Sequence, residues 1–156
     1  MKLNNVHNVY LIGIGGIGMS ALARFFYLNN KRVAGYDKTE TELIKNLIES
    51  GIEVNFEDSI TQIDEAFFDV KNTLVIYTPA IPKSNKQLQF FTEKGFQVFK
   101  RSQVLGLITE QTFCLAVAGT HGKTTTSSIL GHLLKVCEAN MTAFLGGITE
   151  NYHSNL

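Results

Sequence analysis

The sequence predicts an α/β protein with a parallel sheet, and two glycine-rich loops are the main reason. Gly13–Ser20 and Gly119–Thr126 each follow a short apolar run and precede a stretch of helical periodicity. Between them, apolar runs alternate with amphipathic segments, the order that builds parallel β-α-β units. We therefore predict a Rossmann-like parallel-sheet domain over residues 1–108. The start of a P-loop ATPase-type α/β domain follows over residues 109–156.

The elements follow one another at short spacing. Val9–Ile12 is a continuous apolar run, which is typical of a strand buried on both faces of a parallel sheet. Further strands are expected at 32–36, 52–56, 73–77, 96–99, 113–118 and 141–145. Helices are expected after each glycine loop, after the capping box Thr39–Glu42, near Asp58, after Ser84–Gln87, and over 102–110.

The first glycine loop has the spacing G-x-G-x-x-G at Gly13, Gly15 and Gly18. Between a strand and a helix, this spacing is typical of a loop that binds a diphosphate at the helix N-terminus. Asp37 ends the second predicted strand, about twenty residues further on, where an acidic residue commonly binds a ribose hydroxyl. An ordinary loop aspartate at a strand end is the alternative.

Two further segments follow strands that should end at the same edge of the sheet. Thr78–Pro82 is stiffened by the only two prolines of the chain, and Arg101 follows the fifth strand. Ligands of open α/β sheets bind beyond these strand ends, so both segments are candidates for ligand contact. A stiff connector and a solvated charge are the respective alternatives.

The second loop reads G-T-H-G-K-T and differs from the common form G-x-x-x-x-G-K-[ST]. The first glycine of that form would fall at Val117 and is instead at Gly119. Lys123 can reach the β- and γ-phosphates of a nucleotide, and the Thr124 hydroxyl can hold Mg²⁺. The alternative is a glycine-rich turn before an ordinary helix, with Lys123 on its solvated face.

Composition excludes several classes of protein. The net charge is zero, so nothing indicates a nucleic-acid or membrane surface. No apolar run approaches the ~18 residues of a transmembrane helix, and the N-terminus lacks the apolar core of a signal peptide. We therefore expect a cytoplasmic protein. Cys114 and Cys137 match no metal-binding spacing, and a disulfide is not expected in a reducing compartment.

The two loops together resemble those of the Mur ligases, the ATP-dependent enzymes that build the peptidoglycan stem peptide. The similar segments are G-I-G-G-I-G-M-S at Gly13–Ser20, G-Y-D at Gly35–Asp37, T-P-A-I at Thr78–Ile81, the segment at Arg101, and G-T-H-G-K-T-T-T at Gly119–Thr126. The resemblance covers essentially the whole chain in order. Two positions depart from it: Tyr36 stands where the family often has Ser, and Glu57-Asp58 where it often has Gly-His.

The resemblance implies an enzyme of three domains, of which this chain has the first and the beginning of the second. It implies UDP-N-acetylmuramate, L-alanine, ATP and Mg²⁺ as ligands, with an acyl-phosphate intermediate, in peptidoglycan precursor synthesis and hence cell-wall biogenesis. The implied UDP-sugar contacts are Gly15, Gly16, Ile17, Gly18, Met19, Ser20, Asp37, Thr78, Pro79, Ala80 and Arg101. The implied ATP contacts are Gly119, Thr120, His121, Gly122, Lys123, Thr124 and Thr125, with Lys123 catalytic and Thr124 at the metal. Two strands and one helix cannot enclose a core, so the chain alone is expected to be inactive.

Two other functions stay open at this point. One is a sister ligase that recycles an intact tripeptide onto UDP-N-acetylmuramate. The other is a regulatory module that senses a dinucleotide, using Gly13–Gly18 and Asp37 to bind NAD. A second phosphate loop has no role in such a sensor, which favours the ligase.

Overall fold

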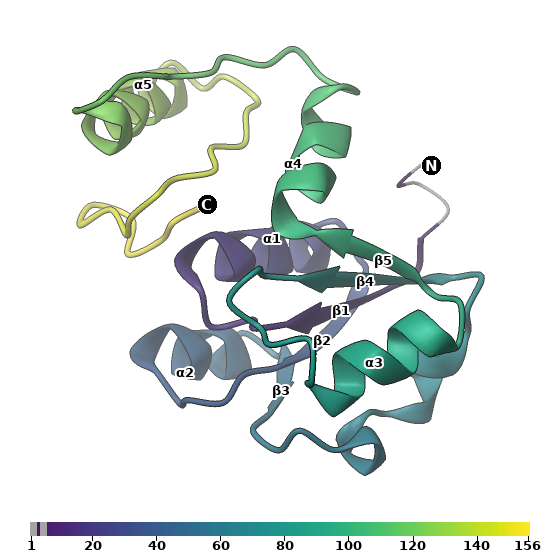
Figure 1. Cartoon of the computed structure of the whole chain (residues 1–156). Helices are drawn as coiled ribbons and strands as arrows, with labels where there is room; N and C mark the ends of the chain where they lie inside the picture. The colour runs from purple at the N-terminus through teal and green to yellow at the C-terminus, as the bar shows by residue number, and fades with distance from the viewer. Residues whose placement is uncertain (1–2, 4–5) are drawn as a thin grey trace.

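The computed structural model describes residue 3 and residues 6–156. A five-stranded, all-parallel sheet has the strand order β3-β2-β1-β4-β5, with helices on both of its faces (Figure 1). The predicted α/β fold class is therefore confirmed. The strands are β1 (Asn8–Ile12), β2 (Arg32–Tyr36), β3 (Glu53–Asn55), β4 (Thr73–Tyr77) and β5 (Gln97–Lys100). The helices are α1 (Ile17–Leu28), α2 (Glu42–Glu49), α3 (Lys86–Glu93), α4 (Arg101–Thr109) and α5 (Lys123–Val136), with 3₁₀ turns η2 (Ile60–Gln62) and η3 (Glu65–Phe68).

The central strand β1 is buried on both faces because successive side chains point to opposite sides of a strand. Val9 and Leu11 pack into the cluster built with α1, α2 and α4. Tyr10 and Ile12 pack into the opposite cluster, which includes Phe67 of η3 and residues of α3. The continuous apolar run seen in the sequence thus follows from a sheet covered by helices on both sides.

A buried polar network ties the sheet to α3. The Tyr10 hydroxyl donates to Oε1 of Gln87 at 2.9 Å and accepts from Nδ2 of Asn55 at 2.7 Å. The Asp58 carboxylate accepts from the backbone N–H groups of Lys86 at 3.0 Å and Gln87 at 3.1 Å. A carboxylate at a helix N-terminus is favourable, so Asp58 has a structural role as a cap of α3. Burial raises the pKa of the Tyr10 hydroxyl.

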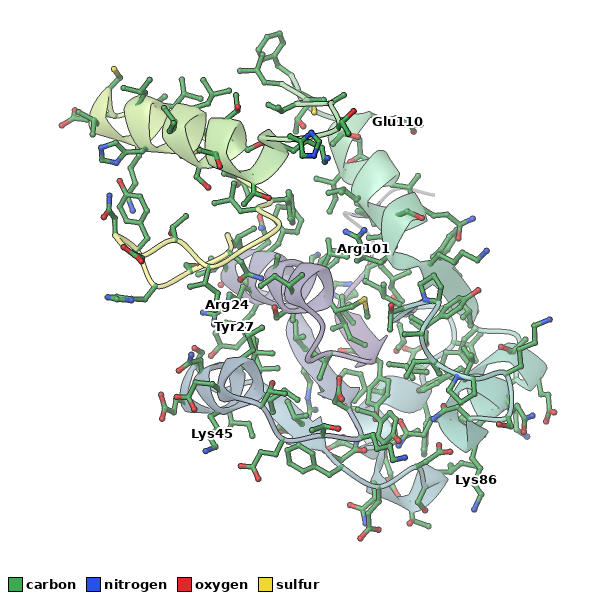
Figure 2. All side chains as sticks on the ribbon, turned by 60° about the vertical axis from the view of Figure 1, so that its left-hand side comes forward. Arg24, Tyr27, Lys45, Lys86, Arg101 and Glu110 are labelled. Atoms are coloured by element: carbon green, nitrogen blue, oxygen red, sulfur yellow. The ribbon has the colours of Figure 1, made fainter. Side chains whose placement is uncertain are left out.

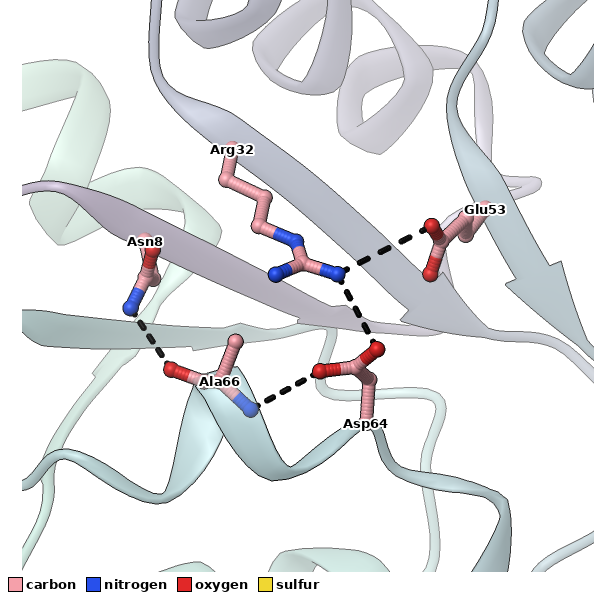
Figure 3. Close-up of polar contacts among 5 residues, drawn as sticks. All are labelled: Asn8, Arg32, Glu53, Asp64 and Ala66. Atoms are coloured by element: carbon pink, nitrogen blue, oxygen red, sulfur yellow. Dashed lines mark hydrogen bonds and ion pairs between the residues drawn. The ribbon is translucent and has the colours of Figure 1, made fainter.

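Figure 3 shows a group of polar contacts at the end of the sheet where β1, β2 and β3 begin. Arg32 binds Asp64 at 3.0 Å and lies 3.9 Å from Glu53. Asp64 also accepts from the N–H of Ala66 at 2.8 Å, and the Ala66 carbonyl accepts from Asn8 at 2.8 Å. These contacts join η3 to β1 and β2 at the end of the sheet away from the glycine loop.

Two of the seven predicted strands are absent. Residues 113–118 and 141–145 have no strand structure, and Phe113 is 91% exposed. Strand geometry is stable only when a neighbour satisfies the backbone hydrogen bonds. Neither segment pairs with the five-stranded sheet, so these two predictions were wrong for this chain.

Three helix starts also differ from the predicted capping boxes. α2 is capped by Thr41, which accepts from Ile44 N–H at 3.4 Å, so Thr39 is not its cap. The N-cap residue of α3 is Asn85, which accepts from Leu88 N–H at 2.8 Å and so shares the start of this helix with Asp58. The helix expected near Asp58 is only the 3₁₀ turn η2. In the first two cases, the residue that accepts from the N3 backbone N–H is the one that fits the backbone of the helix start.

The C-terminal part of the chain returns to α1. α5 begins at the second glycine loop, as predicted, and the chain after it runs back toward α1 (Figure 1). The Phe144 ring lies 5.4 Å from the Phe25 ring of α1 and packs against the main core cluster. α5 itself leaves three apolar side chains more than half exposed, Ile129, Leu133 and Val136.

Candidate functional site

The strand order places a crevice between the carboxyl ends of β1 and β4. From β1 the chain continues to β2 and β3 on one side of the sheet and then to β4 and β5 on the other side. The point between β1 and β4 is therefore a topological switch point, where open α/β sheets bind ligands. The chain turns at Gly13, which has a φ of +86°, and passes close to Thr78. Only glycine fits there, because an added Cβ would lie 2.5 Å from Cγ2 of Thr78. A cavity of about 380 Å³ lies beside this crevice. Residues of the first loop, β4, α4 and the C-terminal segment line it, among them Gly16, Ile17, Gly18, Met19, Thr78, Arg101, Phe144 and Gly146.

Asp37 occupies one backbone donor of the glycine loop. Its Oδ2 accepts from the N–H of Gly15 at 2.8 Å, and its Oδ1 accepts from the N–H of Thr39 at 3.2 Å. The Gly15 N–H therefore already has an acceptor, and a carboxylate lies beside it. An anion would be repelled from this side of the loop.

Two N–H groups of the same loop are free. Gly16 donates to the Gly13 carbonyl at 3.3 Å, whereas Ile17 and Gly18, the first two residues of α1, have no acceptor within the described part of the chain. Unpaired N–H groups at a helix N-terminus bind anions, because they donate hydrogen bonds and the helix dipole favours negative charge there. Of the predicted loop contacts, Ile17 and Gly18 are the ones with donors to offer.

Arg101 adds a full positive charge at the same place. It is the first residue of α4, half-buried, and Figure 2 shows it on the side of α4 that faces α1. An added Cβ at Gly18 would lie 2.8 Å from Nη1 of Arg101, so the guanidinium lies directly against the loop. No carboxylate or carbonyl pairs with it among the residues that the structure describes. An unpaired guanidinium beside free N–H groups is the donor set that recognises phosphate.

The other predicted UDP-sugar contacts lie around this centre in different ways. Thr78 is half-buried at the end of β4, and Pro79 and Ala80 are exposed beyond it. Met19 and Ser20 are buried in α1, and the Ser20 hydroxyl already donates to the Ile17 carbonyl at 3.0 Å. Ser20 therefore supports the first turn of α1, and its side chain does not face the cavity.

Tyr36 and Asp58, which stand at the two departures from the family pattern, each have a structural role. Tyr36 is buried in the cluster that covers one face of the sheet. Burial, with the nearby charges of Asp58 and Asp37, raises the pKa of its hydroxyl. Asp58 caps α3, as described above. Neither residue is free to be replaced without a change in local structure.

The second glycine loop is exposed and closed on itself by Lys123. Its Nζ donates to the carbonyls of Gly119 at 2.5 Å and Thr120 at 3.1 Å. Gly122 has a φ of +75°, a conformation that side chains with a Cβ rarely adopt, which explains the glycine there. His121 is exposed in the same loop.

The start of α5 fits a polyphosphate. The N–H groups of Lys123, Thr124 and Thr125 have no acceptor in the described chain, and the first bonded N–H of the helix is that of Thr126, to the Gly122 carbonyl at 2.9 Å. The Thr124 hydroxyl is exposed at this helix end and is suited to Mg²⁺, a cation that prefers oxygen ligands. Across residue 3 and residues 6–156, no group of three His, Cys, Asp or Glu side chains could hold a metal ion. Among the described helices, none has the length and apolar character needed to span a bilayer.

Sequence reasoning missed three residues beside these loops. Gly146 lines the cavity of the first loop, Phe144 packs on α1, and the Asn155 side chain binds the first turn of α1. None belongs to a local motif, and no periodicity marks them. Only the return of the chain onto α1 brings them here.

Three comparisons relate the chain to known proteins. Residues 8–112 match the family described as "Mur ligase family, catalytic domain". The chain belongs to the Mur ligase family. Over its whole length it is 63% identical to a protein of Flavobacterium psychrophilum and 60% identical to one of Flavobacterium johnsoniae, both named UDP-N-acetylmuramate–L-alanine ligase. It spans only about a third of these relatives, 35% and 34% of their length.

Solved structures of Mur ligases have the same fold. The Thermotoga maritima UDP-N-acetylmuramate-alanine ligase MurC matches 95% of this chain, and 34% of its own, with a TM-score of 0.83 at 33% identity. A ligase from Neisseria meningitidis, for UDP-N-acetylmuramate and L-alanyl-γ-D-glutamyl-meso-diaminopimelate, matches 96% of this chain and 46% of its own. Its TM-score is 0.82 at 26% identity. The structural similarity thus covers nearly all of this Mur ligase chain, and the sequence similarity to the two Flavobacterium proteins covers all 156 residues.

Proposed function

We propose that this chain supplies the UDP-sugar site and the ATP loop of a ligase that joins L-alanine to UDP-N-acetylmuramate. The observation that carries the proposal is the anion site at Ile17, Gly18 and Arg101, with all of its donors unpaired. A diphosphate fits two adjacent N–H groups and a guanidinium. The high identity to proteins named for this reaction supports the choice of substrate.

The reaction that we propose has two steps and consumes one ATP. The lactyl carboxylate of UDP-N-acetylmuramate attacks the γ-phosphorus, which forms an acyl phosphate and releases ADP. The amine of L-alanine then attacks the acyl carbon, which forms the amide and releases phosphate and a proton. The first step concentrates negative charge on the transferring group, so positive charge fixed at that point lowers its barrier.

The residues of this chain have separate tasks in that scheme. Ile17, Gly18 and Arg101 hold the diphosphate of the sugar nucleotide. The free N–H groups at the start of α5 hold the phosphates of ATP, and Thr124 provides one oxygen ligand to Mg²⁺, which neutralises phosphate charge when bound. Lys123 must leave the carbonyls of Gly119 and Thr120 to reach the γ-phosphate.

Gly18→Ala should disturb the anion site without lowering the stability of the fold. The new methyl would lie 2.8 Å from Nη1 and 3.0 Å from Cδ of Arg101, so this side chain must move away from the loop. We expect affinity for UDP-N-acetylmuramate, measured by calorimetry, to fall about tenfold, or about 1.4 kcal/mol. The melting temperature should not fall, because alanine favours the helix.

Gly106→Ala in α4 is the matched control. No atom lies within 4 Å of an added Cβ there, so this variant should gain about 0.5–1 kcal/mol in stability and bind the ligand normally. Normal binding by a folded Gly18→Ala variant would contradict the proposed site. Gly15→Val is a poorer probe, because its Cβ would lie 2.7 Å from Ile44 and 2.9 Å from Asp37 and would disturb the loop itself.

The two alternative functions predict different ligands. For a dinucleotide sensor, NAD would raise the melting temperature and UDP would not. We expect the reverse from the 156-residue chain, because it is 63% and 60% identical to proteins named for a UDP-sugar substrate. A saturable response to micromolar NAD, without a response to UDP, would overturn the ligase proposal. The tripeptide-recycling ligase is distinguished by turnover with tripeptide in place of L-alanine in the full-length protein.

A further inference from the structure

The segment that follows α5 lies between the two phosphate loops. Its residues Phe144 and Asn155 contact α1, the helix that begins at the first loop. Its backbone is closed on itself near these contacts, because Leu145 N–H donates to the Asn155 carbonyl at 3.0 Å. A second closure follows, where Thr149 N–H donates to the Ser154 carbonyl at 2.9 Å. We call residues 144–155 the bridging segment.

Asn155 fixes one side of the bridging segment to the first turn of α1. Its side chain is fully buried, and its Nδ2 donates to the Ser20 hydroxyl at 2.9 Å and to the Ile17 carbonyl. The Ser20 hydroxyl in turn donates to the same Ile17 carbonyl. Ile17 is one of the two residues with a free N–H for the diphosphate, so Asn155 binds the peptide next to that donor.

Only one end of the Asn155 amide is used. Its Oδ1 is buried without a partner among the described residues. A buried polar atom that makes no hydrogen bond is unfavourable, so this amide is not the best residue for packing alone. An apolar side chain at this position could not make the hydrogen bonds that Nδ2 donates to Ile17 and Ser20.

The other side of the bridging segment lies against the second loop. An added Cβ at Gly146 would lie 3.1 Å from Oγ1 of Thr124, and one at Gly147 would lie 3.5 Å from its Cγ2. Gly146 also lines the cavity beside Gly18 and Arg101. One short segment therefore contacts the residue suited to Mg²⁺ and the residues suited to the diphosphate.

We propose that the bridging segment sets the distance between the two phosphate loops, with Asn155 as the positioning residue that anchors it. The inference rests on the proposed function, in which the carboxylate of the bound UDP-sugar must meet the γ-phosphate of ATP. Such a transfer depends steeply on the distance and alignment of the reacting groups. A change at Asn155 should therefore affect the rate of the chemical step more than the binding of either substrate.

Asn155→Leu in the full-length protein tests this, because it keeps a side chain of similar size and removes the donor. We expect kcat for L-alanine-dependent phosphate release to fall at least about tenfold. The Kd values for UDP-N-acetylmuramate and ATP, measured separately by calorimetry, should stay within about twofold. Asn151→Leu, an exposed asparagine of the same segment, should leave all of these values unchanged. If Asn155→Leu does not fold, Asn155→Ser is measured in the same way.

The outcomes separate this inference from the proposed function. Absence of ligase activity in the wild-type protein contradicts the function, whereas an active wild type and an equally active Asn155→Leu contradict only the positioning role. A loss of UDP-sugar affinity as large as the loss of kcat/KM would also overturn it, since Asn155 would then act on one site alone. Hydrogen exchange gives a readout independent of activity. Loss of the anchor should speed amide exchange at the hydrogen-bonded N–H groups of Met19 and Ser20 in α1 and of Thr126 in α5, and unchanged exchange at Thr126 would contradict the bridge.

Discussion

Replacement of Lys123 by alanine should lower the ligase rate of the full-length protein at least about a hundredfold. Removal of a single preorganised charge or donor from such a site commonly costs 10²–10³ in rate. Lys123 is the only lysine or arginine in the loop Gly119–Thr126, so no other side chain of either kind can take its place. The affinity for UDP-N-acetylmuramate should survive, because Ile17, Gly18 and Arg101 belong to the other loop. The measurement is phosphate release with and without L-alanine.

Lys94→Ala is the matched control, since Lys94 is an exposed lysine at the end of α3 and belongs to neither loop nor to the bridging segment. It should leave the rate unchanged. The 156-residue chain alone should release no phosphate in response to L-alanine, because its ATP loop is exposed to water and catalysis of this kind requires a site that excludes it. Near-normal turnover by Lys123→Ala would remove this residue from the mechanism.

Arg101→Ala should weaken UDP-N-acetylmuramate binding about 10- to 100-fold. A hydrogen bond to a charged group contributes about 1.5–3 kcal/mol, and Arg101 is the half-buried cation at the site. The loss should depend on the diphosphate, so the variant should discriminate less between UDP and uridine than the wild type does. Calorimetry with the 156-residue chain measures both ligands.

Arg32→Ala is the control for a lost arginine, because Arg32 lies at the opposite edge of the sheet and pairs with Asp64 (Figure 3). Its ion pair is nearly half exposed, so its loss should cost no more than about 1 kcal/mol in stability. The affinity of the Arg32→Ala variant for UDP-N-acetylmuramate should not change. An equal loss of affinity in the two variants would show that Arg101 acts through general charge and not through contact.

The sequence was sufficient for the sheet and its glycine loop because local patterns determine both. An apolar run such as Val9–Ile12 can be buried only between two layers of helices, and Gly13 is required where the chain turns against Thr78. The start of α5 at Lys123 is equally local, since glycine at 122 permits the turn that precedes it. These features depend on neighbours in sequence, so pattern reasoning can find them.

The parts that sequence did not predict depend on contacts between distant residues. The segment 113–118 has the composition of a strand but no partner to pair with. Asp37 was predicted to bind a ribose, but nothing in the motif shows that its carboxylate also accepts from Gly15. Asn155 reaches the first turn of α1 across 135 residues of sequence from Ser20, a contact that no periodicity encodes. The ligand contacts themselves remain predictions.

β1 is the first strand of this chain in sequence and also the central strand of the sheet. Its partner on one side, β2, is separated from it in sequence only by the glycine loop and α1. Its partner on the other side, β4, begins 65 residues after Asn8. During translation, one edge of a largely apolar strand therefore stays unpaired until Thr73–Tyr77 has left the ribosome. Open apolar edges of this kind are where nascent chains associate wrongly. The nascent chain should thus be most prone to bind chaperones before β4 emerges, and much less so once β4 has paired with β1.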